Sequence, residues 1–265
     1  MNNPSFDPDI RRVAHLLADA ARAAILPHFR SAALGTENKL SQGYDPVTVA
    51  DRAAERAMRD ILAAERPDDA ILGEEFGAQA GTSGLTWVLD PIDGTRGFVS
   101  GTPTWGVLIA VSNGTGPFFG IIDQPYIGER FEGSPEGALL THARGQNPLR
   151  TRKTAELSQA VLFTTFPEVG SEAEGKGFHA VAGHTQLTRY GMDCYAYALL
   201  AAGQVDLVIE AGLQAYDIQA PIALVEAAGG VVTDWQGGRA HEGGRAIAAA
   251  NAVIHAQALA ILKDY

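Results

Sequence analysis

Cysteine and long hydrophobic runs are the two features that this sequence most clearly lacks. Cys194 is the single cysteine among 265 residues, so no disulfide can form within the chain, which is usual for a reducing compartment. No stretch approaches the ~18 uninterrupted apolar residues that cross a membrane. The segment MNNPSFDPDIRR lacks the basic start and apolar run of a signal peptide. We therefore expect a cytoplasmic protein that has no membrane partner.

Positive charge is also scarce in this chain. Lys and Arg number 20 against 31 Asp and Glu, which leaves a formal net charge of −11. Nucleic-acid binding needs a basic face, so we expect no nucleic-acid partner. The acidic excess has two explanations that composition cannot separate. It can be a solvated acidic surface, or it can include carboxylates that repel one another until they bind a metal ion.

The length of the chain allows one large domain or two smaller ones that share an interface. Hydrophobic residues make up 46% of it, which is enough for a substantial core. The polar segment 144–158 separates two kinds of pattern. We expect a lobe over residues 1–150, built from a helix pair and an antiparallel sheet, and an α/β lobe over residues 151–265.

Hydrophobic periodicity predicts the elements of each half. The first half should contain helices at 10–29 and 49–65, a polar loop at 31–43, and strands at 70–72 and 85–89. Residues 105–141 alternate strand-like segments with Asn-Gly, Gly-Pro and Gln-Pro turns, as expected of an antiparallel sheet. The second half alternates strands at 161–165, 205–209, 231–234 and 246–250 with helices at 172–182, 194–202, 217–228 and 253–262.

The string WVLDPIDGTRGFVSGTP, from Trp87 to Pro103, is the most informative stretch of the sequence. We expect the preceding strand to end at Asp90, because Pro91 cannot donate to a β-ladder. Asp93, Gly94 and Thr95 follow within a few residues. Hard oxygen ligands crowded at a strand end suit Mg²⁺, and backbone N–H groups after Gly94 suit a phosphate if a helix begins there. An ordinary Asx-turn is the competing interpretation.

Other acids occupy comparable places along the chain. Glu74 and Glu75 follow a short strand, Glu210 ends another, and Asp45 lies in a turn before the second helix. The remaining candidates have simpler explanations, since Asp51 falls in the first turn of a helix and Asp193 and Asp217 each precede one. Carboxylates at these positions complement the helix dipole or cap the helix. Taken together with Asp90 and Asp93, however, the acids favour a shared site.

Four strings taken together resemble the inositol-monophosphatase superfamily, and their order and spacing match over nearly the whole chain. The strings are DPVTVAD (45–51), GEE (73–75), DPIDGT (90–95) and YDIQAPIALVEAAGG (216–230). Within the superfamily the chain is most similar to bacterial histidinol-phosphate phosphatases. Tyr216, Gln219, Pro221 and Asp193 depart from the inositol pattern in that direction.

The resemblance implies a fold and a site. The fold would be α/β (α+β), a layered αβαβα sandwich of the inositol-monophosphatase and fructose-1,6-bisphosphatase type, and most members are homodimers. Two or three Mg²⁺ ions would bind, one to Glu74, Asp90 and the carbonyl of Ile92, and the next to Asp90, Asp93 and Asp217. A third, weaker ion would use Glu74 and water.

The resemblance also implies roles for the remaining residues of the site. Thr95 and Asp45 would orient and deprotonate the attacking water, and Glu74 would share the catalytic work. The N–H groups of Gly94 and Thr95 would hold phosphate oxygens. Asp193 and Glu210 would meet the ammonium and imidazole of L-histidinol phosphate.

The sequence therefore predicts a Mg²⁺-dependent phosphate monoester hydrolase that converts L-histidinol phosphate and water to L-histidinol and phosphate, a step of histidine biosynthesis. The nearest alternative is an inositol-1-monophosphatase or related sugar-phosphate phosphatase that uses the same site. An alternative from another class is a non-catalytic regulatory protein with the same fold. Retention of an acid at every expected ligand position favours an enzyme.

Overall fold

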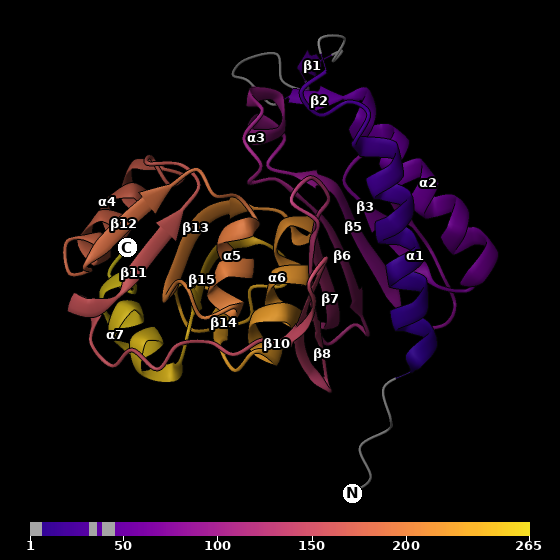
Figure 1. The fold of residues 1–265 in the computed structure, drawn as a ribbon. Helices are drawn as coiled ribbons and strands as arrows, with labels where there is room; N and C mark the ends of the chain where they lie inside the picture. The colour runs from indigo at the N-terminus through magenta and orange to yellow at the C-terminus, as the bar shows by residue number, and fades with distance from the viewer. Residues whose placement is uncertain (1–6, 32–35, 39–45) are drawn as a thin grey trace, which may run out of the picture.

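The computed structural model describes residues 7–31, 36–38 and 46–265, and they form five layers (Figure 1). Helices α1 (Pro8–Ile25) and α2 (Val49–Glu65) form an outer layer, and a mixed eight-stranded sheet lies beneath them. Helices α5 (Tyr195–Ala201) and α6 (Ala215–Ala227) form the middle layer. A five-stranded sheet follows, and helices α4 (Glu172–Ala182) and α7 (Ala252–Leu262) cover its far face. The expected αβαβα sandwich is confirmed.

The outer helices begin at caps that can be read in the sequence. Asp7 accepts a hydrogen bond from the N–H of Asp9 (2.9 Å), and Pro8 occupies the first helical position of α1. At the start of α2, Thr48 and Asp51 form a capping box, as expected for Asp51. The pairing of β1 (Thr36–Asn38) with β2 (Pro46–Thr48) was not expected, because both strands are too short for a periodic signal.

The eight-stranded sheet has the order β10-β9-β8-β7-β6-β5-β3-β4, and only β3 and β5 are parallel. Its strands are β3 (Ala70–Gly73), β4 (Gly77–Gln79), β5 (Thr86–Asp93), β6 (Gly106–Ser112), β7 (Pro117–Gln124), β8 (Glu129–Ser134), β9 (Gly137–His142) and β10 (Gly145–Pro148). The prediction that β5 ends at Asp90 was wrong. Pro91 occupies an irregular step between two paired positions, where its missing N–H is tolerated, and pairing resumes at Asp93.

Helix α6 rests directly on the larger sheet because two glycines leave room for it. A Cβ at Gly120 on β7 would lie 2.6 Å from the carbonyl oxygen of Ala220, and one at Gly133 on β8 would lie 2.4 Å from the Cα of Leu224. One hydrophobic cluster consequently contains Leu108 of the sheet together with Leu224. This cluster contains residues from both sides of residue 150. The division of the chain into two lobes at that residue stays a prediction.

The smaller sheet has the order β12-β11-β13-β15-β14. Its strands are β11 (Val161–Thr164), β12 (Leu187–Tyr190), β13 (Leu207–Leu213), β14 (Val231–Thr233) and β15 (Gly244–Ala249), and a 3₁₀ turn, η1 (Leu157–Gln159), precedes β11. β11 runs parallel to β12 and β13, so the carboxyl ends of β11 and β13 meet at one edge of the sheet. Strand β13 continues past Glu210, where it was expected to end, through an irregularity in register.

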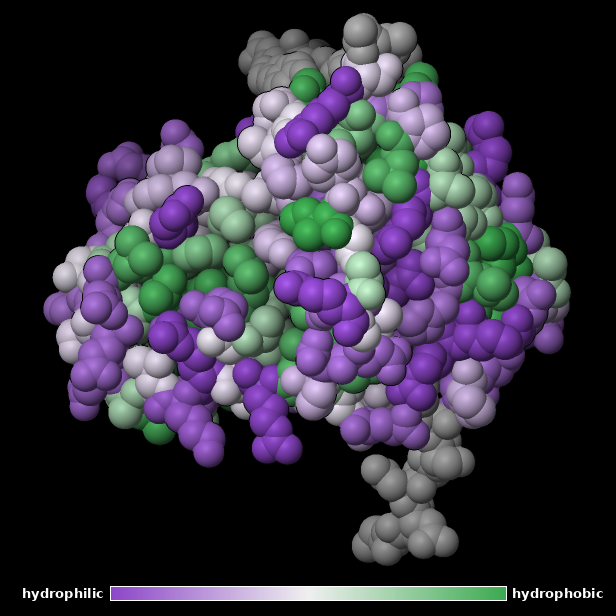
Figure 2. Space-filling view, viewed as in Figure 1, coloured by the Kyte–Doolittle hydropathy of each residue, from purple (hydrophilic) through white to green (hydrophobic). Residues whose placement is uncertain are grey.

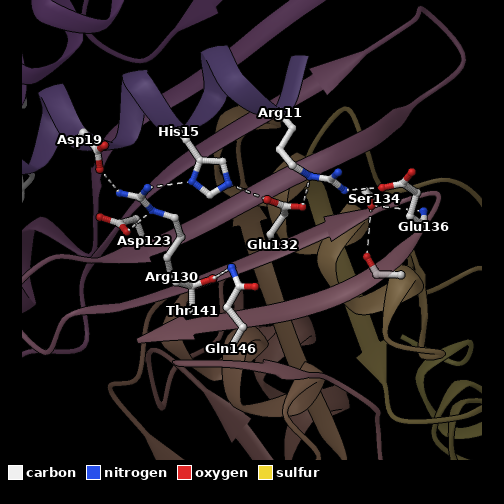
Figure 3. Close-up of polar contacts among 11 residues, drawn as sticks. Arg11, His15, Asp19, Asp123, Arg130, Glu132, Ser134, Glu136, Thr141 and Gln146 are labelled. Atoms are coloured by element: carbon white, nitrogen blue, oxygen red, sulfur yellow. Dashed lines mark hydrogen bonds and ion pairs between the residues drawn. The ribbon is translucent and has the colours of Figure 1, made fainter. Parts of the chain in front are cut away.

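A line of alternating charges fastens α1 to strands β7 and β8 (Figure 3). Arg130 donates to Asp123 (2.7 Å) and to Asp19 (2.6 Å), and Arg11 donates to Glu132 (2.7 Å). His15 lies between Arg130 and Glu132 and contacts both. Because Asp123 is fully buried, these partners offset the cost of burying its charge. The network fixes how the outer helix lies on the sheet.

Candidate active site

A β-bulge in β5 points two carboxylates to the same side. Asp90 pairs with Leu108 and Asp93 pairs with Gly106, so three steps along β5 match two steps along β6. In a regular strand, side chains three residues apart point to opposite faces, and the extra residue of a bulge reverses the second one. The N–H of Ile92 donates to Oδ1 of Asp90 (3.0 Å), which orients that carboxylate. The DPID string therefore places two acids in one cavity.

The chain turns sharply at Gly94 and enters the short helix α3 (Thr95–Ser100). Gly94 has a φ of 84°, in the left-handed region that favours glycine. A Cβ there would also lie 2.7 Å from Cγ of Asp193, so the residue cannot be enlarged without moving that acid. The hydroxyl of Thr95 donates to the carbonyl oxygen of Ile92 (3.0 Å). Gly94 thus permits the sharp turn before Thr95 and leaves room for the side chain of Asp193.

Helix α6 contributes a third carboxylate to the two from β5. Asp217 is the third residue of α6, and its Oδ2 accepts the N–H of Gln214 (2.7 Å). The capping role expected of Asp217 is therefore present, but it does not exclude another. One oxygen each from Asp90, Asp93 and Asp217 lies within 4.8 Å of the others. Residues more than 120 positions apart in the chain thus converge on one point.

The electrostatics of this cluster suit a divalent cation. Burial, and then the neighbouring acids, raise the pKa of Asp90 well above its ordinary range, and Asp93 behaves in the same way. Burial raises the pKa of Asp217 to about 7, although the Gln214 N–H opposes the shift. Carboxylates that resist ionisation next to one another are stabilised by a bound cation. The hard oxygen donors match Mg²⁺.

Glu74 lies at the edge of the same cluster, directly after β3. Its N–H donates to the carbonyl oxygen of Leu89 on β5 (3.1 Å), which ties it to the strand that carries Asp90. The charge of Glu74 contributes to raising the pKa of Asp90 and of Asp217. The expected ligands Glu74, Asp90, Asp93, Asp217 and Ile92 all line one cavity of about 370 Å³, which Gly94 and Thr95 line as well.

Asp193 and Glu210 line the same cavity and already have hydrogen-bond partners. The hydroxyl of Thr104 donates to Asp193 (2.8 Å), and Asp193 has a strained φ of 46°. Glu210 accepts the hydroxyls of Thr165 (2.6 Å) and Tyr197 (2.7 Å). Burial nevertheless raises the pKa of both acids.

Cys194 enters the wall of the site, which spacing along the sequence did not suggest. Its N–H donates to Oδ2 of Asp93 (2.6 Å), and a Cβ at Gly106 would lie 2.8 Å from its Sγ. Burial raises the pKa of the thiol well above its ordinary range. Cys194 therefore contacts the acidic cluster through its backbone N–H.

A model of the inositol monophosphatase family matches residues 8–265. The chloroplastic bifunctional phosphatase IMPL2 of Arabidopsis thaliana is 43% identical over 86% of this chain, which spans 64% of that protein's length. A histidinol-phosphatase of Streptomyces coelicolor is 37% identical over 98% of this chain and 99% of its own length. The solved structure of an inositol monophosphatase from Zymomonas mobilis matches with a TM-score of 0.86 at 38% identity, over 98% of this chain and 100% of that one.

The chain belongs to the inositol monophosphatase family. Its relatives are phosphatases, and members of the family are metal-dependent. The acidic cluster between β5 and α6 is the place where such a metal could bind.

The structure adds several residues to the site of this family member. Arg96 and Phe166 line the cavity, and the guanidinium of Arg96 lies 4.7 Å from the centroid of the Phe166 ring. Arg96 is the one basic side chain among the described residues that line this cavity. Arg96 follows DPIDGT and Phe166 follows a strand end, so position offered a weak signal for each.

Two acids of the DPVTVAD string have different outcomes. Asp45 lies outside the described residues. Asp51 caps α2 as expected, but it is also only 1% exposed. Burial raises its pKa to about 6, and the charges of Glu74 and Glu75 add to the shift. Asp51 therefore stands close enough to Glu74 for the two charges to interact, which the sequence did not indicate.

Proposed function

We propose that this protein is a Mg²⁺-dependent phosphate monoester hydrolase whose substrate is L-histidinol phosphate. The observation that carries the proposal is the convergence of Asp90, Asp93 and Asp217 within 4.8 Å, in a chain whose relatives are phosphatases. The histidinol-phosphatase of Streptomyces coelicolor, which the chain matches almost from end to end, supports the choice of substrate.

Two or three Mg²⁺ ions are assigned to this cluster. Glu74, Asp90 and the carbonyl oxygen of Ile92 would hold one, and Asp90, Asp93 and Asp217 would hold another, with Asp90 shared. When bound, Mg²⁺ neutralises charge on the phosphoryl group and lowers the pKa of water. The raised pKa values of Asp90 and Asp93 support this assignment, because a cation offsets both the burial and the mutual repulsion that raise them.

The chain itself would orient the substrate and accept a proton. The N–H groups of Gly94 and Thr95 would donate to phosphate oxygens at the turn into α3. The Thr95 hydroxyl, which donates to Ile92, would orient the attacking water beside Glu74. We assign the acceptance of the proton to Asp45. The buried Asp51 is a second carboxylate of the same segment, and comparing kcat of Asp45→Asn with that of Asp51→Asn separates the two.

Substrate selection is assigned to Asp193 and Glu210. L-Histidinol phosphate carries an ammonium group and an imidazole that titrates near pH ~6.5, whereas a polyol phosphate carries no cation. The oxygens of Glu210 accept from Thr165 and Tyr197, and a carboxylate can accept about four hydrogen bonds in all, so it can still meet a substrate cation. The Thr104 hydroxyl holds Asp193 in place for the same purpose.

One comparison tests this proposal most directly. We expect a kcat/KM for L-histidinol phosphate at least about tenfold above that for inositol 1-phosphate in the same Mg²⁺ buffer, which corresponds to ~1.4 kcal/mol of transition-state discrimination. A preference for inositol 1-phosphate would instead support the alternative function, an inositol or sugar-phosphate phosphatase. The likeness to the Zymomonas mobilis inositol monophosphatase favours that alternative.

A non-catalytic regulatory role is the proposal from another class. The acids Glu74, Asp90, Asp93 and Asp217 and the hydroxyl of Thr95 are all present in one cavity, which supports an enzyme instead. Purified protein with neither phosphatase activity nor a Mg²⁺-dependent thermal shift would support the regulatory role.

We further propose that the protein forms a homodimer and works in the cytoplasm. The resemblance to the family supports the dimer, and the single cysteine supports a reducing compartment. None of the described helices is long and apolar enough to cross a membrane. Sedimentation of the purified protein tests the dimer.

A further inference from the structure

A buried ion pair on α2 lies directly behind the turn that carries Glu74. Glu55 is 0% exposed and lies in the middle of α2. Its Oε1 accepts Nε of Arg59 at 2.7 Å, one turn further along. An isolated buried charge is strongly unfavourable unless hydrogen bonds satisfy it. The other hydrogen bonds of the Glu55 carboxylate therefore identify the groups that it positions.

Those bonds go to the backbone immediately after Glu74. Oε2 of Glu55 accepts the N–H of Glu75 (2.6 Å), and Oε1 accepts the N–H of Phe76 (3.2 Å). Glu74 itself donates its N–H to Leu89 of β5. The backbone around Glu74 is thus held from one side by β5 and from the other side by α2.

Gly73 makes this arrangement sterically possible. A Cβ at Gly73 would lie 2.0 Å from Oε1 of Glu55, so the carboxylate occupies the space of the missing side chain. Arg59 closes the turn from outside by donating to the carbonyl oxygen of Gly77. The glycine of the GEE string is therefore explained by a carboxylate eighteen residues earlier in the chain.

We propose that Glu55 is a positioning residue for the first metal ligand, and that it acts by fixing the turn Gly73–Phe76 so that Glu74 faces Asp90. This inference rests on the proposed Mg²⁺ site. Its chemistry is that of a carboxylate that accepts two successive backbone N–H groups, as at a helix start, but between separate elements. Glu55 is not among the residues that line the cavity of the site.

The test is Mg²⁺ binding to the metal-free, substrate-free protein, measured by titration calorimetry. Glu55→Gln keeps the shape but turns one acceptor into a donor that faces a backbone N–H. We expect its Mg²⁺ dissociation constant to rise about tenfold, and kcat to recover at saturating Mg²⁺. Glu65→Gln is the matched control, because Glu65 ends the same helix, is exposed and pairs with Arg12. It should leave Mg²⁺ affinity unchanged.

A second arm uses the glycine. Gly73→Ala should displace the Glu55 carboxylate without changing its charge, and it should weaken Mg²⁺ binding to a similar extent. In a Glu55→Ala background the same substitution should have little further effect, because the only close neighbour then left is the end of the flexible Arg59 side chain, 2.8 Å from the added Cβ. If Glu55→Gln fails to fold, Gly73→Ala carries the test alone.

The outcomes separate the two proposals. Unchanged Mg²⁺ affinity in Glu55→Gln or Gly73→Ala, together with a lowered melting temperature, would show that Glu55 only stabilises the fold and would overturn the inference. Strictly additive effects of Gly73→Ala and Glu55→Ala on Mg²⁺ affinity would also overturn the inference. A wild-type protein that binds no Mg²⁺ would refute the proposed metal site itself, before any variant is compared.

Discussion

Asp90 is the one carboxylate that we assign to both of the main Mg²⁺ positions in the proposed site. It is 2% exposed, and three neighbouring acids raise its pKa in addition to burial. We expect Asp90→Asn to lower kcat/KM by about three orders of magnitude or more, because it removes the charge shared by two metal positions. The measurement is phosphate release at saturating Mg²⁺, and activity near that of the wild type would refute the assignment.

The same substitution should not unfold the protein. In metal-free buffer near neutral pH the Asn variant should melt at or above the temperature of the wild type, since the ionised Asp90 is destabilised by burial and by its neighbours. A large fall in melting temperature in the presence of chelator would show that Asp90 has a structural role instead.

Asp193 tests substrate choice at the level of one residue. Asp193→Ala should raise KM for L-histidinol phosphate about tenfold, through loss of a charged contact, and should leave inositol 1-phosphate hydrolysis within about twofold of the wild-type value. Steady-state kinetics on both substrates measure the difference. Equal losses on the two substrates would mean that Asp193 supports the turn at Gly94, where an added Cβ would lie 2.7 Å from it, and does not select the substrate.

Asp51 gives a pH dependence of stability. Burial raises its pKa in the folded protein to about 6 from an ordinary 3.8, so the stability it contributes is complete below pH 3.8 and is lost as pH rises through 6. The free energy of unfolding of Asp51→Asn, relative to the wild type, should therefore increase by up to about 3 kcal/mol between about pH 4 and pH 8.

Urea unfolding in metal-free buffer at several pH values measures this difference. Asp60→Asn, at an exposed position of the same helix, is the control, and its difference from the wild type should stay flat with pH. A flat difference for Asp51→Asn would contradict the pKa assigned to Asp51.

At the scale of elements, the position of α6 depends on glycines in the sheet below it, where a side chain would collide with the helix. Gly133→Ala would place a methyl group 2.4 Å from the Cα of Leu224. Because the clash is with the backbone of α6, rotation of a side chain cannot relieve it. We expect a loss of about 2 kcal/mol in the free energy of unfolding, with a fall in activity because α6 carries Asp217. Urea denaturation and phosphate release measure both effects.

Gly183→Ala is the matched control for that prediction. An added Cβ there would lie 3.5 Å from its nearest neighbour, an ordinary contact. It should change the free energy of unfolding by less than about 1 kcal/mol in either direction. Equal losses at Gly133 and Gly183 would mean that close packing of α6 is not the cause.

At the scale of the whole molecule, the hydrophobic core is separate from the proposed metal site. Three buried hydrophobic clusters fill the spaces between the layers, and none is built from the metal-site acids. The face in Figure 2 shows hydrophobic residues in separate clusters among hydrophilic ones, so much of the large apolar content is buried in the interior. The fold should therefore persist without metal.

Chelation should accordingly abolish activity but lower the melting temperature only modestly. A ligand present at 100 times its dissociation constant adds about 2.7 kcal/mol, which is a shift of roughly 10 °C or less for a chain of this size. Calorimetry with and without chelator, alongside an activity assay, makes the comparison. Collapse of the fold in chelator would contradict the independence of the core.

Local patterns in the sequence determined much of this protein. The caps at Asp7 and Asp51, the meander of β6 to β9 and the DPIDGT corner follow from turn chemistry and periodicity, which act between near neighbours. Six of the acids expected to share a site line one cavity, namely Glu74, Asp90, Asp93, Asp193, Glu210 and Asp217. They could be predicted because the family resemblance supplied long-range information that periodicity does not contain.

The tertiary structure alone decided the geometry of the site. A bulge opposite Val107 carries β5 past Pro91 and points Asp93 to the side of Asp90, an outcome set by the partner strand. The burial of Glu55 behind Gly73, the hydrogen bond from Tyr197 to Glu210 and the position of Cys194 beside Asp93 also depend on contacts between distant segments. Sequence spacing encodes local conformation, whereas burial and charge coupling arise only when the layers pack.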